Sequence, residues 1–141
     1  MSALFFEDVQ EGDAAPEVRH TLTRTDLVHY AGASGDLNPM HHDDEQARAS
    51  GLPSVFGHGM FSMGLLARCV TDWSGVGSMR SFKVRFTKQT WPGEELVSSV
   101  TVTGKRLDGD DHLVDLAVSL ANQDGALKVA GEASVAVASK S

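Results

Sequence analysis

The sequence predicts an α+β fold in which an antiparallel β-sheet wraps around one long helix. Two observations carry this prediction. Residues 57–73 are apolar on nearly every helical face, so a helix there is expected to be buried rather than to lie on the surface. Residues 82–137 alternate apolar and polar side chains in runs separated by short turns, as in an antiparallel meander. Since each element can bury its apolar face on the other, a sheet curled around the helix is the economical arrangement.

The first elements are a short strand and a capped helix. Residues 17–22 are assigned to the strand. Thr23 is followed three residues later by Asp26, and this pattern starts helices because the hydroxyl and the carboxylate satisfy N–H groups that lack a helical partner. Apolar residues continue at helical spacing as far as residues 32–35, where glycines close the helix.

A proline-containing loop and two helices follow. Pro39 disfavours helical backbone at Asn38, so the loop after the first helix starts as extended or turn backbone. Residues 44–50 form a short helical piece that ends at a Gly-Leu-Pro sequence. Residues 57–73 form the long helix, in which Cys69 is expected to be a buried, inert apolar residue.

The second half of the chain is predicted to be all strand. Its strands are separated by a Pro-Gly turn, an aspartate-rich turn and the hairpin signal Asn-Gln-Asp-Gly. Successive strands joined in this way are expected to pair with one another. The predicted strands are residues 82–86, 96–107, 113–121 and 127–137.

Composition limits the classes of protein to be considered. The chain has 141 residues without repeats or linkers, which suits one domain over residues 1–141. A formal charge of −7 argues against a nucleic-acid-binding protein, and no apolar stretch has the length needed to span a membrane. The single cysteine excludes an internal disulfide, and the acidic N-terminus does not look like a signal peptide, so a cytoplasmic location is expected.

The loop Gly-Asp-Leu-Asn-Pro-Met-His-His-Asp, residues 35–43, concentrates polar side chains. An aspartate or asparagine beside a proline is commonly a turn former whose side chain bonds to nearby backbone. For Asn38 and Pro39 we favour this loop-shaping role. His42 and Asp43 are interpreted as loop residues outside any site.

A metal site built from the histidines of this region is not favoured. The spacing of His41, His42, Asp43 and His58 matches no usual zinc pattern, and neighbouring histidines in extended chain point apart. No metal and no cofactor are therefore predicted. His58 is interpreted as a residue at a helix start that bonds to backbone.

Two motifs resemble a known family. Residues 30–41, YAGASGDLNPMH, followed by residues 56–60, FGHGM, are similar to the MaoC-like, R-specific enoyl-CoA hydratase family. The resemblance covers most of the chain, and two separated motifs in the right order make it specific. It implies the hot-dog fold, a sheet wrapped around a central helix, and a dimer with acyl pockets near the interface. One departure is that Thr90-Trp91 stands where many relatives have Pro-Val, which is expected to reshape the acyl pocket.

The resemblance also implies roles for particular residues. The family's catalytic aspartate and histidine match Asp36 and His41, whose spacing across a proline turn allows both side chains to bind one water. A carboxylate and an imidazole suit proton transfer, and which is base and which is acid stays open, as in a coupled pair. Gly59, at the start of the long helix, matches the glycine whose N–H stabilises the oxyanion, consistent with the partial positive charge of helix N-termini.

The leading functional hypothesis is a hydro-lyase. It would hydrate trans-2-enoyl thioesters, of coenzyme A or of an acyl carrier protein, to R-3-hydroxyacyl thioesters, or run the reverse dehydration. The alternatives are an acyl-CoA thioesterase on the same fold, a partner subunit of a heterodimeric hydratase, and an acyl-thioester-binding module. The presence of both Asp36 and His41 favours hydration. A homodimer is expected, with a heterodimer as the alternative, and the acyl chain is not specified by the sequence.

Overall fold

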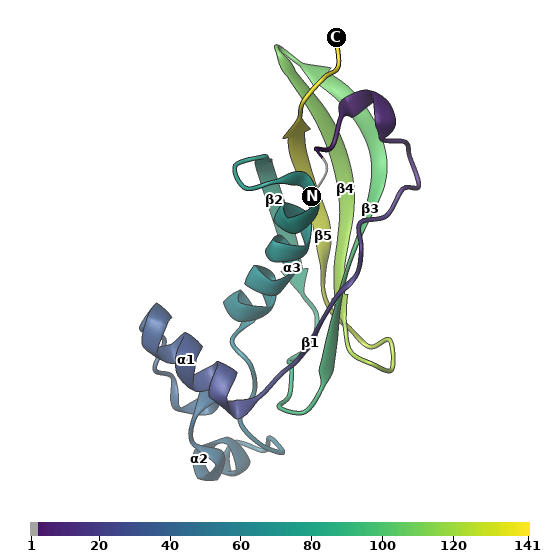
Figure 1. The fold of residues 1–141 in the computed structure, drawn as a ribbon. Coiled ribbons are helices and arrows are strands. Elements are labelled where there is room, and N and C mark those ends of the chain that lie inside the picture. The colour runs from purple at the N-terminus through teal and green to yellow at the C-terminus, as the bar shows by residue number, and fades with distance from the viewer. Residues whose placement is uncertain (1–2) are drawn as a thin grey trace.

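The protein is one curved antiparallel sheet with a long helix lying across one of its faces (Figure 1). The computed structural model describes residues 3–141. The strand order is β1-β3-β4-β5-β2, and the predicted sheet around a central helix is confirmed. The main elements are β1 (Val18–Thr21), α3 (Gly59–Ser74), β2 (Met79–Phe86), β3 (Glu95–Asp108), β4 (Asp111–Ala121) and β5 (Leu127–Val137).

Three of the smaller helices, α1 (Arg24–Ser34), η2 (Pro39–His41) and α2 (Asp44–Ala49), precede α3, and α1 and α2 lie together at one end of the molecule (Figure 1). The short helix η1 (Phe6–Asp8) lies at the other end, against β4. The predicted cap of α1 is present. Thr23 Oγ1 accepts the Asp26 N–H at 3.1 Å, and the Asp26 carboxylate accepts the Thr23 N–H at 2.9 Å. Gly35 ends the helix with φ 75°, a left-handed conformation that glycine adopts without strain.

The prediction that successive strands pair is correct for β3, β4 and β5 and wrong for β2. β2 pairs with β5, not with β3. The connecting residues 87–94 form a longer segment than a tight hairpin loop. They run from the β2 edge of the sheet toward the β1 edge. There the Gly93 N–H donates to the Leu22 carbonyl at 2.7 Å, and the Leu22 N–H donates to the Glu94 carbonyl at 2.9 Å.

The long helix buries one face rather than all of them. Ser62, Leu66, Cys69 and Val70 are buried against the sheet, whereas Met60 is 58% exposed. The expectation of a fully buried helix is therefore wrong for a single chain, because one sheet covers only one side of it. Within residues 3–141, none of the helices combines the length and the apolar composition that crossing a membrane requires.

Candidate active site

Short-range hydrogen bonds fix the loop between α1 and η2. The Asp36 N–H donates to Ser34 Oγ at 3.1 Å, and Asp36 Oδ1 accepts the Asn38 N–H at 3.3 Å. Asn38 Oδ1 in turn accepts the Met40 N–H at 3.0 Å and caps η2, where Pro39 occupies the first turn. These bonds hold the half-exposed Asp36 carboxylate so that its second oxygen, Oδ2, faces His41.

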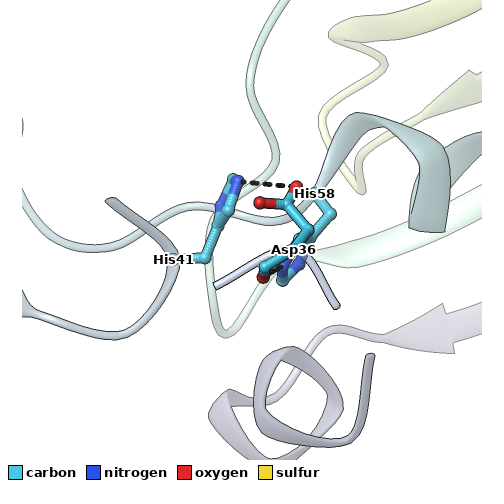
Figure 2. Close-up of side chains that lie close together, drawn as sticks. All are labelled: Asp36, His41 and His58. Atoms are coloured by element: carbon cyan, nitrogen blue, oxygen red, sulfur yellow. Dashed lines mark hydrogen bonds and ion pairs between the residues drawn. The ribbon is translucent and has the colours of Figure 1, made fainter. Parts of the chain in front are cut away.

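His41 is buried, and its hydrogen bond fixes which ring nitrogen carries the proton. Nδ1 lies 2.6 Å from the Phe56 carbonyl oxygen, which only accepts, so Nδ1 is the donor. In the neutral ring Nε2 then has a free lone pair. Nε2 lies 3.9 Å from Asp36 Oδ2 (Figure 2). That gap is too long for a direct hydrogen bond and suits one water held by both groups.

His58 contacts both members of this pair. Its ring stacks on that of His41, with centroids 3.8 Å apart and planes 27° apart. Its Nε2–H donates to the backbone carbonyl of Asp36 at 3.2 Å (Figure 2), as expected for a histidine bonded to backbone. The side chain is 2% exposed. Burial lowers the pKa of His58, the bond to Asp36 opposes this, and nearby His41 lowers it further, so the ring is neutral at pH 7.

The position of His58 beside Asp36 and His41 is absent from the sequence prediction. Its contacts with Asp36 and His41 are tertiary, and no local periodicity or turn pattern in the sequence predicts them. The remaining loop residues serve elsewhere. His42 Nε2 lies 3.2 Å from the Leu37 carbonyl, and Asp43, expected to have no particular role, caps α2 by accepting the Gln46 N–H at 3.2 Å.

A metal ion fits this cluster poorly. Asp36, His41 and His58 each offer a ligand atom, and these atoms lie within 4.8 Å of one another. However, zinc needs nitrogen lone pairs that converge on one point at about 2.0–2.1 Å. The His41 and His58 rings are stacked 3.8 Å apart with their planes 27° apart, so their in-plane lone pairs do not point at a metal ion between the two rings. One nitrogen of each ring already faces a backbone carbonyl. The arrangement suits a bound water better than a metal.

The start of α3 completes the site. The helix begins at Gly59, and no side chain of His58 caps it, so the first N–H groups keep their partial positive charge. A Cβ added to Gly59 would lie 3.4 Å from the Phe86 ring, an ordinary van der Waals contact, so Phe86 faces the helix start. A pocket of about 280 Å³ opens beside Gly59. One of its walls is Phe56, whose ring meets the His41 ring edge-on at 4.9 Å.

Comparisons with known proteins agree on one family. Residues 6–123 match the MaoC like domain family. The (R)-specific enoyl-CoA hydratase of Rhodospirillum rubrum is 30% identical over 102 residues, which are 71% of this chain and 70% of the relative. Among solved structures, the R-hydratase PhaJ1 from Pseudomonas aeruginosa superimposes with a TM-score of 0.87 at 26% identity, covering 98% of this chain and 88% of that one.

A structure of a two-component complex is also similar. The ChsH1-ChsH2 complex from Mycobacterium tuberculosis contains a chain with a TM-score of 0.80 at 27% identity, covering 92% of this chain and 98% of that one. Some relatives are longer. This chain spans 30% of a probable enoyl-CoA hydratase 2 from Dictyostelium discoideum and 27% of an enoyl-CoA hydratase from Mycobacterium tuberculosis.

Proposed function

Because this chain belongs to the MaoC-like domain family, we propose that it is a hydro-lyase that adds water to trans-2-enoyl thioesters and forms R-3-hydroxyacyl thioesters, or runs the reverse dehydration. The observation that carries the proposal is the 3.9 Å gap between His41 Nε2 and Asp36 Oδ2. A water in that gap is held by two groups able to take its proton. Gly59, the first residue of α3, lines the adjoining pocket, and the His58 side chain does not cap this helix start.

In the hydration direction the bound water loses a proton to the Asp36 and His41 pair, and its oxygen forms a bond to C3 of the enoyl group. The electrons of the C2–C3 double bond move toward the thioester carbonyl, giving an enolate. The Gly59 N–H stabilises the negative charge on the enolate oxygen, which was the thioester carbonyl oxygen. Donors fixed at a helix start can do this without reorganising. A proton from the pair then adds to C2, so the net change is the addition of one water.

His58 supports this chemistry without entering it. It binds the Asp36 backbone carbonyl through a hydrogen bond, and its ring stacks on the His41 ring. A buried neutral imidazole beside His41 adds no positive charge of its own. The two reacting groups are thereby fixed relative to one another, and preorganisation of this kind is worth large rate factors.

We further propose a homodimer, with a heterodimer as the alternative. Strand β2 is an edge of the sheet, so its outer backbone groups are free to pair with another chain. The outer face of α3 and the half-exposed Phe86 add apolar surface near the pocket. Light scattering on the purified chain tests this, since a monomer at micromolar concentration would contradict a stable homodimer.

The function is tested by mixing the protein with a short enoyl-CoA and following loss of the conjugated-enoyl absorbance. Asp36→Asn and His41→Ala are each expected to lower kcat/KM by about a hundredfold or more. His42→Ala is the matched control, because within residues 3–141 the His42 side chain bonds only to the Leu37 carbonyl, and the rate of this variant should be unchanged. Chiral analysis should find the R product.

Three outcomes would contradict this assignment. Unchanged rates in both Asp36→Asn and His41→Ala would remove the pair from the mechanism. Release of free coenzyme A in place of hydration would favour a thioesterase. Binding of the thioester with no turnover would favour a binding module or a subunit that needs a partner.

A further inference from the structure

The peptide group between Phe56 and Gly57 connects the His41 ring to a wall of the pocket. His41 Nδ1–H donates to the Phe56 carbonyl at 2.6 Å. The N–H of the same peptide group, on Gly57, donates to the Thr90 carbonyl at 2.8 Å. Because the C=O and the N–H of a trans peptide group point in opposite directions, this group bridges His41 and Thr90, a residue that lines the pocket.

The Thr90 carbonyl belongs to a second peptide group, which ends at a carboxylate. The N–H of this group, on Trp91, donates to Glu94 Oε1 at 2.6 Å. A tight turn brings the acceptor there, since Pro92 precedes Gly93, whose φ of 96° suits the third position of a type II turn. The Glu94 N–H closes this turn by donating to the Trp91 carbonyl at 3.1 Å. The sequence Trp-Pro-Gly-Glu thus returns a carboxylate to its own first N–H.

The three hydrogen bonds from His41 to Glu94 run in one direction, and we call them the relay. Each N–H donates toward the carboxylate end, so each bond polarises and strengthens the next. The relay is shielded from water, since His41 and Thr90 are 8% and 3% exposed and the Glu94 side chain 12%. Its negative end favours a proton on Nδ1 and so leaves a lone pair on Nε2, the nitrogen nearest Asp36.

The two oxygens of Glu94 have separate partners. Oε2 lies 2.9 Å from Lys128 Nζ and accepts from Asn122 Nδ2 at 2.7 Å. Within residues 3–141, Oε1 accepts only the Trp91 N–H. Burial raises the pKa of Glu94, but the bonds from Asn122, Lys128 and Trp91 outweigh it, so the group is a carboxylate at neutral pH. The ion pair therefore fixes one oxygen and leaves the other to the relay.

We propose that Glu94 is a positioning residue for His41, which acts through two peptide groups to hold the Nδ1 proton and the orientation of the ring. The inference rests on the proposed function, in which Nε2 has to be free to take a proton from water. A carboxylate bonded directly to a histidine sets its tautomer in the same way. Transmission through two peptide groups makes the expected effect smaller.

Two double variants separate the relay from the ion pair. Both contain Lys128→Met, so neither leaves a buried charge. Glu94→Gln with Lys128→Met keeps an oxygen that can accept the Trp91 N–H, whereas Glu94→Leu with Lys128→Met removes that acceptor. The readout is NMR of the ring nitrogens through the carbon-bound ring protons, at about pH 8, where a histidine is ordinarily neutral. It reports which nitrogen carries the proton, and His41→Ala assigns the signals by removing them.

The unaltered protein and Glu94→Gln with Lys128→Met should carry the His41 proton on Nδ1. Glu94→Leu with Lys128→Met should show a mixture of the two tautomers. Its kcat/KM for hydration of an enoyl-CoA should be about tenfold below that of the other double variant. Both should bind a saturated acyl-CoA equally, because the pocket lining is unchanged.

Val114→Ala is the control for lost stability. Val114 is fully buried near the start of β4, away from Leu120, the strand partner of the pocket residue Val129. This variant destabilises the core and should leave the His41 signals unchanged. A tautomer change in Val114→Ala would overturn the inference, since any loss of stability would then produce it.

The inference is also overturned if the unaltered protein carries the proton on Nε2, or if the two double variants have the same tautomer or hydrate an enoyl-CoA at the same measurable rate. The tautomer is read without substrate, so the two proposals can fail separately. If the tautomers differ and no protein hydrates, the proposed function fails and the relay to His41 stands. If hydration occurs and the tautomers are the same, the relay fails and the proposed function stands.

Discussion

Replacing Lys128 by methionine removes the cation from a buried ion pair beneath residues 87–94. Lys128 Nζ lies 2.9 Å from Glu94 Oε2, and the two side chains are 4% and 12% exposed. Glu94 also accepts hydrogen bonds from the Trp91 N–H at 2.6 Å and from Asn122 Nδ2 at 2.7 Å. Burial alone raises the pKa of Glu94, but the hydrogen bonds from Asn122, Lys128 and Trp91 outweigh it and leave that pKa lowered.

The expected loss of stability follows from the Glu94 carboxylate, which stays buried after its cation is removed. Breaking a buried pair by removing one partner costs about 3–5 kcal/mol, because the other charge stays buried. Glu94 keeps its bonds to Trp91 and Asn122, so the lower end, about 3 kcal/mol, is expected for Lys128→Met. For a domain of this size that corresponds to a fall in Tm of roughly 10 °C. The double variant Lys128→Met with Glu94→Leu should recover much of the loss, since no buried charge remains.

Differential scanning calorimetry at neutral pH measures this directly. Lys140→Met is the matched control, because Lys140 also pairs with a carboxylate, Asp8, but both side chains are more than half exposed at 52% and 54%. A surface pair of this kind is worth about 0–1 kcal/mol, so the Tm of Lys140→Met should hardly differ from that of the unaltered protein. If Lys128→Met were as stable as Lys140→Met, the argument from burial would be refuted.

Three further predictions concern the site, the backbone and acid stability. His58→Phe keeps a stacked ring and loses the hydrogen bond to the Asp36 carbonyl. Its kcat/KM should therefore fall by about tenfold, while binding of a saturated acyl-CoA is little changed. An unaltered rate and pH profile would contradict the positioning role of His58. Gly57→Ala should cost about 1–3 kcal/mol in urea unfolding, because its Cβ would lie 2.2 Å from Thr90 Oγ1, and adding Thr90→Ala should restore most of it. A hydrogen bond from Ser139 lowers the pKa of Glu7 from 4.5 to about 2, so the stability that this carboxylate contributes is present above pH 4.5 and is lost as the pH falls toward 2. Glu7→Gln should therefore flatten the acid side of the Tm profile between those pH values.

Local signals in the sequence were sufficient for most elements and for the proximity of two residues of the candidate site. The Thr23 and Asp26 cap, the glycine that ends α1 and the strand alternation each act over a few residues, and each element they predict is present. Asp36 and His41 are close in the chain across a proline turn, so their proximity followed from spacing.

Features that depend on distant parts of the chain were not predictable in this way. The pairing of β2 with β5 depends on a strand that lies far along the sequence, and alternation within β2 carries no information about its neighbour. The stacking of His58 on His41 likewise arises only when α3 packs beside the η2 loop. The exposed side of α3 reflects how much of a helix one sheet can cover, which composition cannot report.

The pairing of β2 with β5 also bears on how the protein folds during synthesis. β2 leaves the ribosome before β3, β4 and β5, yet its backbone partners, from Phe86 with Val129 to Met79 with Val135, lie in the last strand. At about 5–20 residues per second, β2 waits several seconds without a partner, with both of its edges open. Over that interval the nascent chain exposes an apolar helix and an unpaired strand together. Folding is thus expected to be completed only when β5 emerges, and chaperone binding to the nascent chain should be strongest just before that point.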